Sequence, residues 1–136
     1  MGRVVSRIPT TRSVVALTFD AGANGEGVDS ILATLAREKV PASFFLTGDF
    51  VDSDPTLARG MSAAGRLGNH TTKHSHLPAL TAADVRTQIT GAGTTILRVT
   101  GQDPRPLFRF PFGDSSPRDL QLVNALGYIA VGWSVV

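Results

Sequence analysis

The chain contains no cysteine among its 136 residues. This excludes disulfide bonds, cysteine-ligated metals and a thiol nucleophile, so any metal site must use histidine and carboxylate ligands. No apolar run approaches the roughly 20 residues that span a bilayer, and residues 1–6 (MGRVVS) lack the apolar stretch of a signal peptide. The net charge is only +2, and the basic residues are scattered singly from Arg3 to Arg118. We therefore expect no membrane span and no nucleic-acid partner.

Histidine is also scarce, but its distribution is informative. All three histidines fall within residues 70–76, as His70, His74 and His76. Neutral imidazole is the commonest protein ligand for zinc, and an H-x-x-x-H spacing brings two imidazoles to one side of a helical turn. The cluster therefore indicates a metal site, while a chance cluster on a polar loop is the alternative that other residues must decide.

The length and the hydrophobic content of 42% fit one globular domain with its own core. Short apolar runs alternate with segments of helical periodicity, which predicts an α/β fold built on a parallel sheet with right-handed crossovers. We expect five strands near 14–19, 42–46, 66–69, 107–110 and 128–133, and four helices near 28–39, 54–64, 81–99 and 116–126.

Three of these helices have start signals in the sequence. Asp54-Pro55 and Ser116-Pro117 each place an N-cap residue before a proline, and Thr81 with Asp84 resembles a capping box. Gly127 is expected to end the last helix.

Residues that could take part in catalysis or binding lie at the end of each predicted strand. Asp20 follows the first, Thr47 the second, the histidines of 70–76 the third and residues 109–113 the fourth, while Trp133 ends the fifth. The carboxyl ends of parallel strands meet at one end of a sheet, where the active sites of such folds lie. The sequence therefore predicts that these five segments form one site.

Five blocks resemble, in order, those of the NodB-like polysaccharide deacetylases, carbohydrate esterase family 4: residues 17–22 (LTFDAG), 42–48 (ASFFLTG), 68–74 (GNHTTKH), 109–113 (RFPFG) and 127–135 (GYIAVGWSV). The resemblance covers 14–136, which we interpret as the deacetylase domain after a lead segment, 1–13. It implies a distorted (β/α) barrel and an extracellular or cell-wall enzyme. Such an enzyme uses a divalent metal to remove acetyl groups from N-acetylated polysaccharide such as peptidoglycan or chitin, or O-acetyl groups from xylan.

The resemblance also implies roles for individual residues. His70 and His74 match the two metal histidines, Asp20 matches the general base, and Arg109 matches the arginine that holds this carboxylate. Asp20 and Arg109 each have a simpler alternative. Asp20 would then be a turn or N-cap residue, and Arg109 a surface ion-pair partner.

Three further residues are expected to border the substrate. The backbone N–H of Phe112 matches a donor to the oxyanion, Pro111 precedes it, and Trp133 borders the sugar site unless it belongs to the core. Thr71 is expected to brace the histidine loop by hydrogen bonding. His76 falls at a variable position of the family and is expected to lie outside the site.

Ala21 departs from the family pattern. It stands where the family has an aspartate that is the third protein ligand of the metal. Two neutral histidines without a carboxylate should bind a dication more weakly. Asn24 is a possible compensating ligand, and Asp20 is another, although a metal-bound Asp20 would be a poorer base. Zinc is the expected metal because it suits imidazole ligands.

The second departure is that the sequence stops at Val136, before the family's Leu-x-His block that supplies the general acid. We therefore expect a barrel that is incomplete at its C-terminal end, with an apolar edge through which copies of the chain could associate. The competing interpretation is a degenerate, non-catalytic module of the same lineage that binds glycan or metal. A flavodoxin-like sheet is the alternative fold, but residues 22–25 lack the G-x-G-x-x-G spacing of a phosphate loop.

Overall fold

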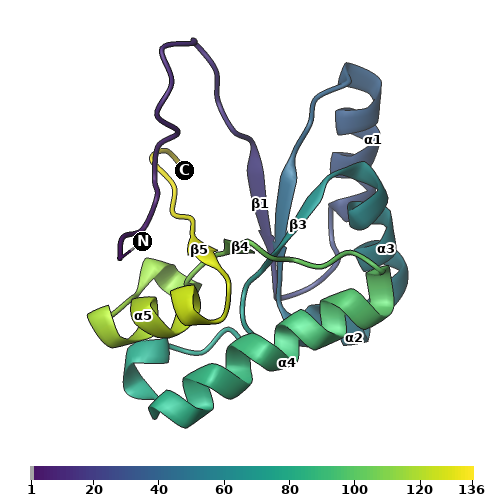
Figure 1. The fold of residues 1–136 in the computed structure, drawn as a ribbon. Coiled ribbons are helices and arrows are strands. Elements are labelled where there is room, and N and C mark those ends of the chain that lie inside the picture. Colours follow the sequence, from purple (N-terminus) through teal and green to yellow (C-terminus); the bar gives the residue numbers. More distant parts are fainter. Residues whose placement is uncertain (1) are drawn as a thin grey trace.

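The computed structural model describes residues 2–136, which form a curved five-stranded parallel sheet (Figure 1). The strands follow one another in the sheet in chain order, which fits the barrel implied by the family resemblance and not the flavodoxin-like alternative. They are β1 (Thr18–Ala21), β2 (Ser43–Leu46), β3 (Arg66–Asn69), β4 (Leu107–Phe108) and β5 (Ile129–Ala130). β1 starts and ends later than the predicted 14–19, so Asp20 lies within this strand and not after it, and β4 and β5 are shorter than predicted, so Trp133 lies beyond β5. The apolar pair Val14 and Val15 stays outside β1, where Val15 is 93% exposed.

Five α-helices connect and follow the strands: α1 (Val28–Glu38), α2 (Gly48–Ser53), α3 (Pro55–Ala64), α4 (Ala82–Thr100) and α5 (Pro117–Ala125). Two 3₁₀ turns, η1 (Leu77–Ala79) and η2 (Pro111–Gly113), precede α4 and α5. The prediction of four helices missed α2. This helix is too short to show a periodic pattern, and it starts because the Thr47 hydroxyl accepts a hydrogen bond from the Phe50 N–H at 3.2 Å.

Two of the three predicted helix caps are present. The hydroxyl of Thr81 accepts a hydrogen bond from the Asp84 N–H, and that of Ser116 accepts one from the Asp119 N–H. Pro55 is the first residue of α3, but the Asp54 side chain makes no capping bond, so that part of the prediction is wrong.

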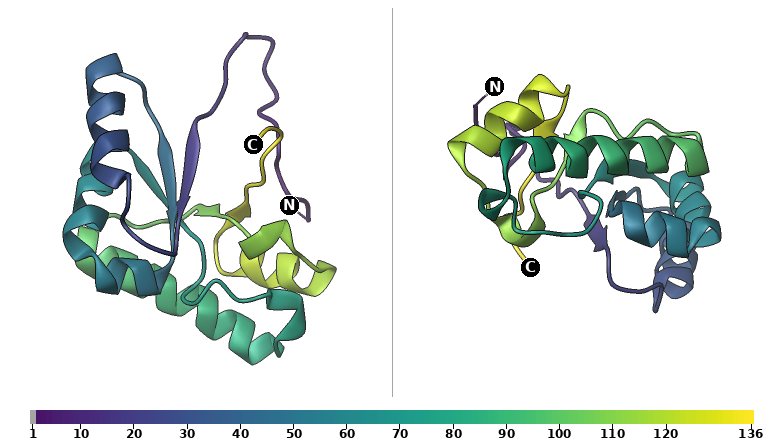
Figure 2. Two further views of the ribbon diagram at one scale, coloured as in Figure 1. Left: turned by 180° about the vertical axis from the view of Figure 1, so that it is seen from behind. Right: turned by 90° about the horizontal axis from the view of Figure 1, so that it is seen from below.

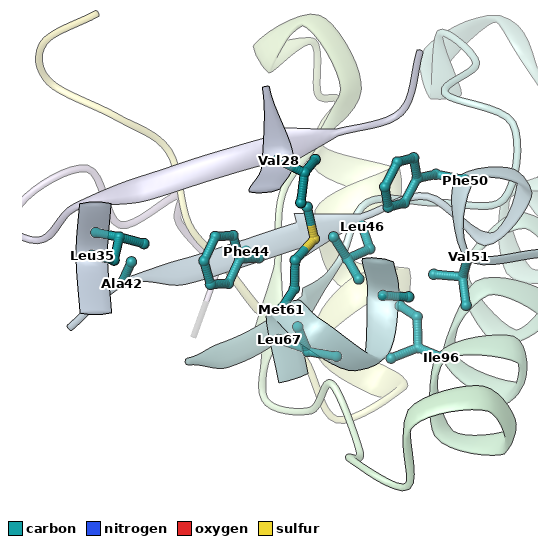
Figure 3. Close-up of a cluster of buried hydrophobic side chains, with 11 residues drawn as sticks. Val28, Leu35, Ala42, Phe44, Leu46, Phe50, Val51, Met61, Leu67 and Ile96 are labelled. Atoms are coloured by element: carbon teal, nitrogen blue, oxygen red, sulfur yellow. The ribbon is translucent and has the colours of Figure 1, made fainter. Parts of the chain in front are cut away.

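The helices pack along the outer side of the sheet, α1 on α3, α3 on α4 and α4 on α5 (Figure 2). One buried apolar cluster joins β2 and β3 to α1, α2, α3 and α4 and includes Phe44, Leu46 and Ile96 (Figure 3). A second cluster joins η1, α4, β4, α5 and β5. With the helices on this side, the opposite face of the sheet and the strand ends are left for polar residues.

Part of the predicted lead segment belongs to the fold. The N–H of Val5 donates to the Ala130 carbonyl at 2.8 Å, the Gly132 N–H donates to the Val5 carbonyl at 2.9 Å, and Val5 pairs in parallel with Val131. In Figure 1 the purple N-terminal segment accordingly lies beside the yellow C-terminal one. The edge of β5 was expected to be free for self-association, but at these residues it is covered by the same chain.

No helix within residues 2–136 combines the length and the apolar character needed to cross a bilayer.

Candidate active site

Strand register brings the site together on the inner face of the sheet. Asp20 on β1 is paired with Phe45 on β2, which is paired with Gly68 on β3. Paired residues share a face of the sheet. A Cβ at position 68 would lie 2.5 Å from the Phe45 ring, so only glycine leaves room for this ring. The guanidinium carbon of Arg109, which follows β4, lies 4.0 Å from the centre of the same ring.

Asp20 and Arg109 form the predicted contact. Oδ1 of Asp20 lies 2.7 Å from Nη1 of Arg109. The other guanidinium nitrogens donate to the Thr18 hydroxyl at 3.0 Å and to the carbonyls of Val131 and Gly132 at 3.2 and 3.1 Å. The Arg109 side chain is only 4% exposed, which contradicts the alternative of a surface ion pair. A buried guanidinium with every nitrogen engaged fixes the carboxylate in one orientation.

His70 is buried beside this pair in the form that can bind a metal. Its Nδ1 lies 2.8 Å from the carbonyl oxygen of Arg109. A carbonyl only accepts, so Nδ1 carries the proton and Nε2 holds the free lone pair, 3.7 Å from Oδ2 of Asp20. Burial lowers the pKa of His70 below its usual value, against the opposing effects of the Arg109 carbonyl and the Asp20 carboxylate. The imidazole is therefore neutral at neutral pH.

His74 reaches His70 through a loop rather than through the predicted helical turn. Residues 70–76 form no helix, and both Thr71 (φ 69°) and His74 (φ 56°) have left-handed backbone conformations. The two imidazole rings meet edge to face with centroids 4.7 Å apart. The expected brace is present, because the Thr71 hydroxyl accepts a hydrogen bond from the His74 N–H at 3.1 Å.

Asn69 is a supporting residue that sequence reasoning missed. It is fully buried, and its Nδ2 donates to the Ile89 carbonyl at 2.8 Å and to the Tyr128 hydroxyl at 3.0 Å. Its Oδ1 accepts a hydrogen bond from the Thr71 N–H at 2.9 Å. The sequence did contain a signal for this role, because Asn69 ends an apolar strand. A polar side chain that is buried there needs hydrogen-bond partners.

The η2 turn contains Phe112, whose N–H is the expected oxyanion donor. Pro111 is its buried first residue, and Phe112 has a left-handed backbone (φ 60°, ψ 5°), which typically costs about 1–3 kcal/mol in a non-glycine residue. The N–H groups of Gly113 and Asp114 donate to the carbonyls of Phe110 and Pro111, at 3.1 and 3.0 Å. Within residues 2–136 the Phe112 N–H has no such partner.

Trp133 lies at the rim rather than in the core. It is 42% exposed, and its ring centre lies 5.7 Å from the Arg109 guanidinium carbon. With Val4, Ser6, Gly113 and others it lines a hollow of about 190 Å³ beside Arg109. The side chain therefore has the exposure that a residue bordering a substrate needs.

The histidine pair fits a divalent metal only in part. Two neutral imidazoles are the donors that zinc prefers, and His70 is oriented for binding by a backbone carbonyl. Across residues 2–136, however, no three histidine, aspartate or glutamate side chains are grouped closely enough to hold an ion. Asn24 is engaged elsewhere, because its Oδ1 accepts a hydrogen bond from the Glu26 N–H at 2.9 Å. Ala21 packs partly against the apolar core.

A curved parallel sheet with an Asp–Arg pair and two histidines at its carboxyl end places the chain among α/β proteins of the (β/α) barrel type. Residues 7–131 match the model of the polysaccharide deacetylase family. The chain belongs to this family, the NodB-like deacetylases of carbohydrate esterase family 4.

Two curated relatives illustrate this membership. The chain is 32% identical over 127 residues to the peptidoglycan-N-acetylmuramic acid deacetylase PdaA of Bacillus subtilis, covering 93% of this chain and 48% of the relative. It is 36% identical over 134 residues to a chitooligosaccharide deacetylase of Sinorhizobium fredii, covering 98% of this chain and 62% of the relative. The chain thus spans about half to three fifths of their length.

The fold is also similar to that of a crystallised mutant of a family 4 pseudoenzyme, a mutant with restored enzymatic activity. The TM-score is 0.94 and the identity 26%, covering 99% of this chain and 50% of the other. The wild-type pseudoenzyme comes from Bacillus anthracis.

Proposed function

We propose that this protein is a metal-dependent hydrolase that removes acetyl groups from N-acetylated polysaccharide of the peptidoglycan or chitin type. The observation that carries the proposal is the Asp20–Arg109 pair, held beside the buried, neutral His70. The family and the substrates named for its relatives support the substrate class. Because such polymers lie outside the cell, we infer an extracellular or cell-wall location.

Each site residue has its own role in the proposed hydrolysis. Asp20 accepts a proton from the attacking water, and Arg109 keeps its carboxylate in position for that transfer. The Phe112 N–H donates to the acetyl oxygen as negative charge develops there. His70 and His74 would hold the metal ion, with zinc the best-suited candidate. When bound, that ion would lower the pKa of water and polarise the acetyl carbonyl.

Leaving-group chemistry sets the expected substrate order. An amine must be protonated as it departs, whereas an activated ester releases a stable alcoholate unaided. No histidine follows His76 in the 136 residues. We expect faster hydrolysis of an activated aryl acetate than of N-acetylglucosamine oligomers.

The test measures acetate release by the 136-residue chain from both substrates, with added zinc or cobalt. Asp20→Asn should abolish release while leaving the fold intact. Arg109→Ala should reduce release less, because it removes orientation rather than the base. Asp52→Asn is the control, since Asp52 pairs with Arg98 in an exposed ion pair outside the site. Equal activity of wild type and Asp20→Asn would contradict the proposal.

The second candidate is a non-catalytic module that binds glycan or metal. It is favoured by Ala21, which leaves the histidine pair without a third ligand, and by the likeness to a family 4 pseudoenzyme. This function predicts zinc binding or glycan binding by calorimetry without acetate release from either substrate. Loss of zinc binding in a His70→Ala/His74→Ala variant would assign the binding to this site.

A further inference from the structure

The Phe112 ring is held between two histidines. On one side the His74 ring meets it edge to face, with centroids 4.6 Å apart and an angle of 68° between the rings. On the other side His76 stacks on it almost in parallel, with centroids 3.9 Å apart and an angle of 6°. Phe112 is nonetheless 57% exposed, so no apolar core fixes the ring. The aromatic contacts of this ring within residues 2–136 are with these two imidazoles.

His76 is itself anchored from two directions. Its Nδ1 lies 3.2 Å from Oδ2 of Asp114, the second residue after Phe112. Its carbonyl accepts a hydrogen bond from the Ala79 N–H at 3.2 Å, which ties it to the η1 turn. The histidine loop and the η2 turn, which are far apart in sequence, are thus joined at His76.

Ring position and backbone conformation are coupled at Phe112. Its left-handed backbone is strained for a residue with a side chain, so it persists only if its surroundings hold it. A change of φ toward the relaxed region would swing the ring out from between the imidazoles and redirect the N–H. The adjacent Gly113 has no side chain to hold the Phe112 ring; its N–H donates to the Phe110 carbonyl within the turn, and its backbone lies against Trp133. A Cβ there would approach the indole to 2.9 Å.

We propose that His76, anchored by Asp114, is a positioning residue that holds Phe112 in its left-handed conformation and thereby aims the Phe112 N–H at the acetyl oxygen. The inference rests on the proposed deacetylase function for the role of that N–H. It assigns His76 to the site, outside which the sequence had placed it. The aromatic face of His76, rather than a proton that it transfers, performs this role.

The test compares His76→Ala, which removes the stacked face, with His76→Phe, which keeps it. Asp52→Asn again serves as the control outside the site. Aryl acetate hydrolysis gives kcat and KM. Trp133 gives a readout that does not depend on activity, because it is the only tryptophan of the chain and packs against Gly113. Quenching of its fluorescence by acrylamide reports whether the η2 turn has moved.

In His76→Ala we expect kcat to fall by about 10–100-fold with little change in KM. A displacement of about 1 Å can cost 100-fold, and loss of a whole oxyanion donor about 100–1,000-fold. Trp133 quenching should increase. His76→Phe should restore both readouts to within about threefold of wild type. Thermal unfolding of each variant verifies that the fold is intact.

Two results would overturn the inference. If His76→Ala leaves kcat and quenching unchanged, His76 does not position the turn. If His76→Phe is as impaired in kcat as His76→Ala while quenching is restored, imidazole chemistry rather than stacking is required. Should the wild-type chain release no acetate at all, the proposed function fails. The quenching comparison then still decides whether His76 holds the turn.

Discussion

The two loops that border the candidate site are held very differently. Backbone hydrogen bonds tie the histidine loop, residues 70–76, to α2, where Gly48 and Asp49 donate to the carbonyls of Thr71 and Thr72. Contacts to Gln88 tie it to α4, because Thr72 donates to the Gln88 carbonyl and Lys73 donates to its side chain. Asn69 secures its start. This loop is therefore fixed before any ligand binds.

The β1–α1 loop, residues 22–27, is held by few bonds. The Asn24 side chain caps a local turn, and the Val28 N–H donates to the Gly25 carbonyl at 3.2 Å. Behind it lies a cavity of about 260 Å³ lined mostly by apolar residues, including Ala21, Phe44 and Met61. Most of the loop is exposed.

The difference locates the weak point of the site. His70 and His74 are held in place by the fold, whereas the β1–α1 loop, which follows the position of the missing aspartate at Ala21, is loosely supported. Removing a hydrogen bond that supports a preorganised loop should weaken metal binding at the site. Adding a metal-binding side chain to a loosely held loop can strengthen it. We therefore expect mutations that loosen the histidine loop to lower zinc affinity and a carboxylate added beside the β1–α1 loop to raise it.

The largest effect is expected for Asn69→Ala. It removes three hydrogen bonds and leaves the Thr71 N–H, the Ile89 carbonyl and the Tyr128 hydroxyl without their partner. Each unsatisfied buried group costs about 1–3 kcal/mol, and the Ile89 carbonyl keeps its hydrogen bond within α4. The other two groups therefore predict a loss of about 2–6 kcal/mol in the free energy of unfolding. Denaturant unfolding measures it, together with zinc affinity, which should fall as the loop loosens.

Asn24→Ala is the matched control in the other loop. It removes one exposed hydrogen bond, so we expect a change below about 1 kcal/mol. If Asn24→Ala and Asn69→Ala lowered the free energy of unfolding by similar amounts, the two loops would not differ in how firmly they are held.

The contrast also explains what the sequence could and could not predict. The parallel direction of the strands follows from the alternating pattern, and the positions of Arg109 and His70 follow from their places after strands. Asp20 instead lies within β1, which extends two residues further than predicted. The conformation of the histidine loop does not, because its left-handed residues are stabilised by bonds to Gln88 and α2, which lie elsewhere in the chain. The contacts of His76 could not be predicted for the same reason, since its partners are Phe112 in η2 and Asp114 directly after it.

The second prediction adds the missing carboxylate. Ala21→Asp should raise zinc affinity by at least about tenfold, since removal of even an outer-shell partner of a metal ligand typically costs about 10–100-fold. A Cβ at the next residue, Gly22, would lie 3.9 Å from Cδ2 of His74, and the loosely held loop must move for a carboxylate at position 21 to reach the histidines. Calorimetric titration with zinc measures the change.

Ala21→Asn controls for size and polarity without the charge, and it should give a smaller gain. If Ala21→Asp binds zinc no more tightly than wild type, the loop does not bring position 21 to the histidines. The comparison between a fixed and an adaptable loop would then be wrong.

A smaller effect than that of Asn69→Ala is expected at Tyr128, which supports the histidine loop through Asn69. Burial raises the pKa of its hydroxyl above the usual value, although the hydrogen bond from Asn69 opposes the shift. The folded chain therefore holds this proton more tightly than the unfolded chain. This contribution to stability is fully present below pH about 10 and is lost as the pH rises through the folded-state pKa. Because Tyr128 is the only tyrosine, phenolate absorbance reports it directly. The folded chain should titrate at higher pH than the chain unfolded in guanidinium.

At neutral pH Tyr128→Phe should lower the free energy of unfolding by only about 0.5–1.5 kcal/mol, because Asn69 keeps its bonds to Ile89 and Thr71. Identical titration curves for the folded and unfolded chains would mean that this support is open to water, and the histidine loop would then be less firmly held than its hydrogen bonds indicate.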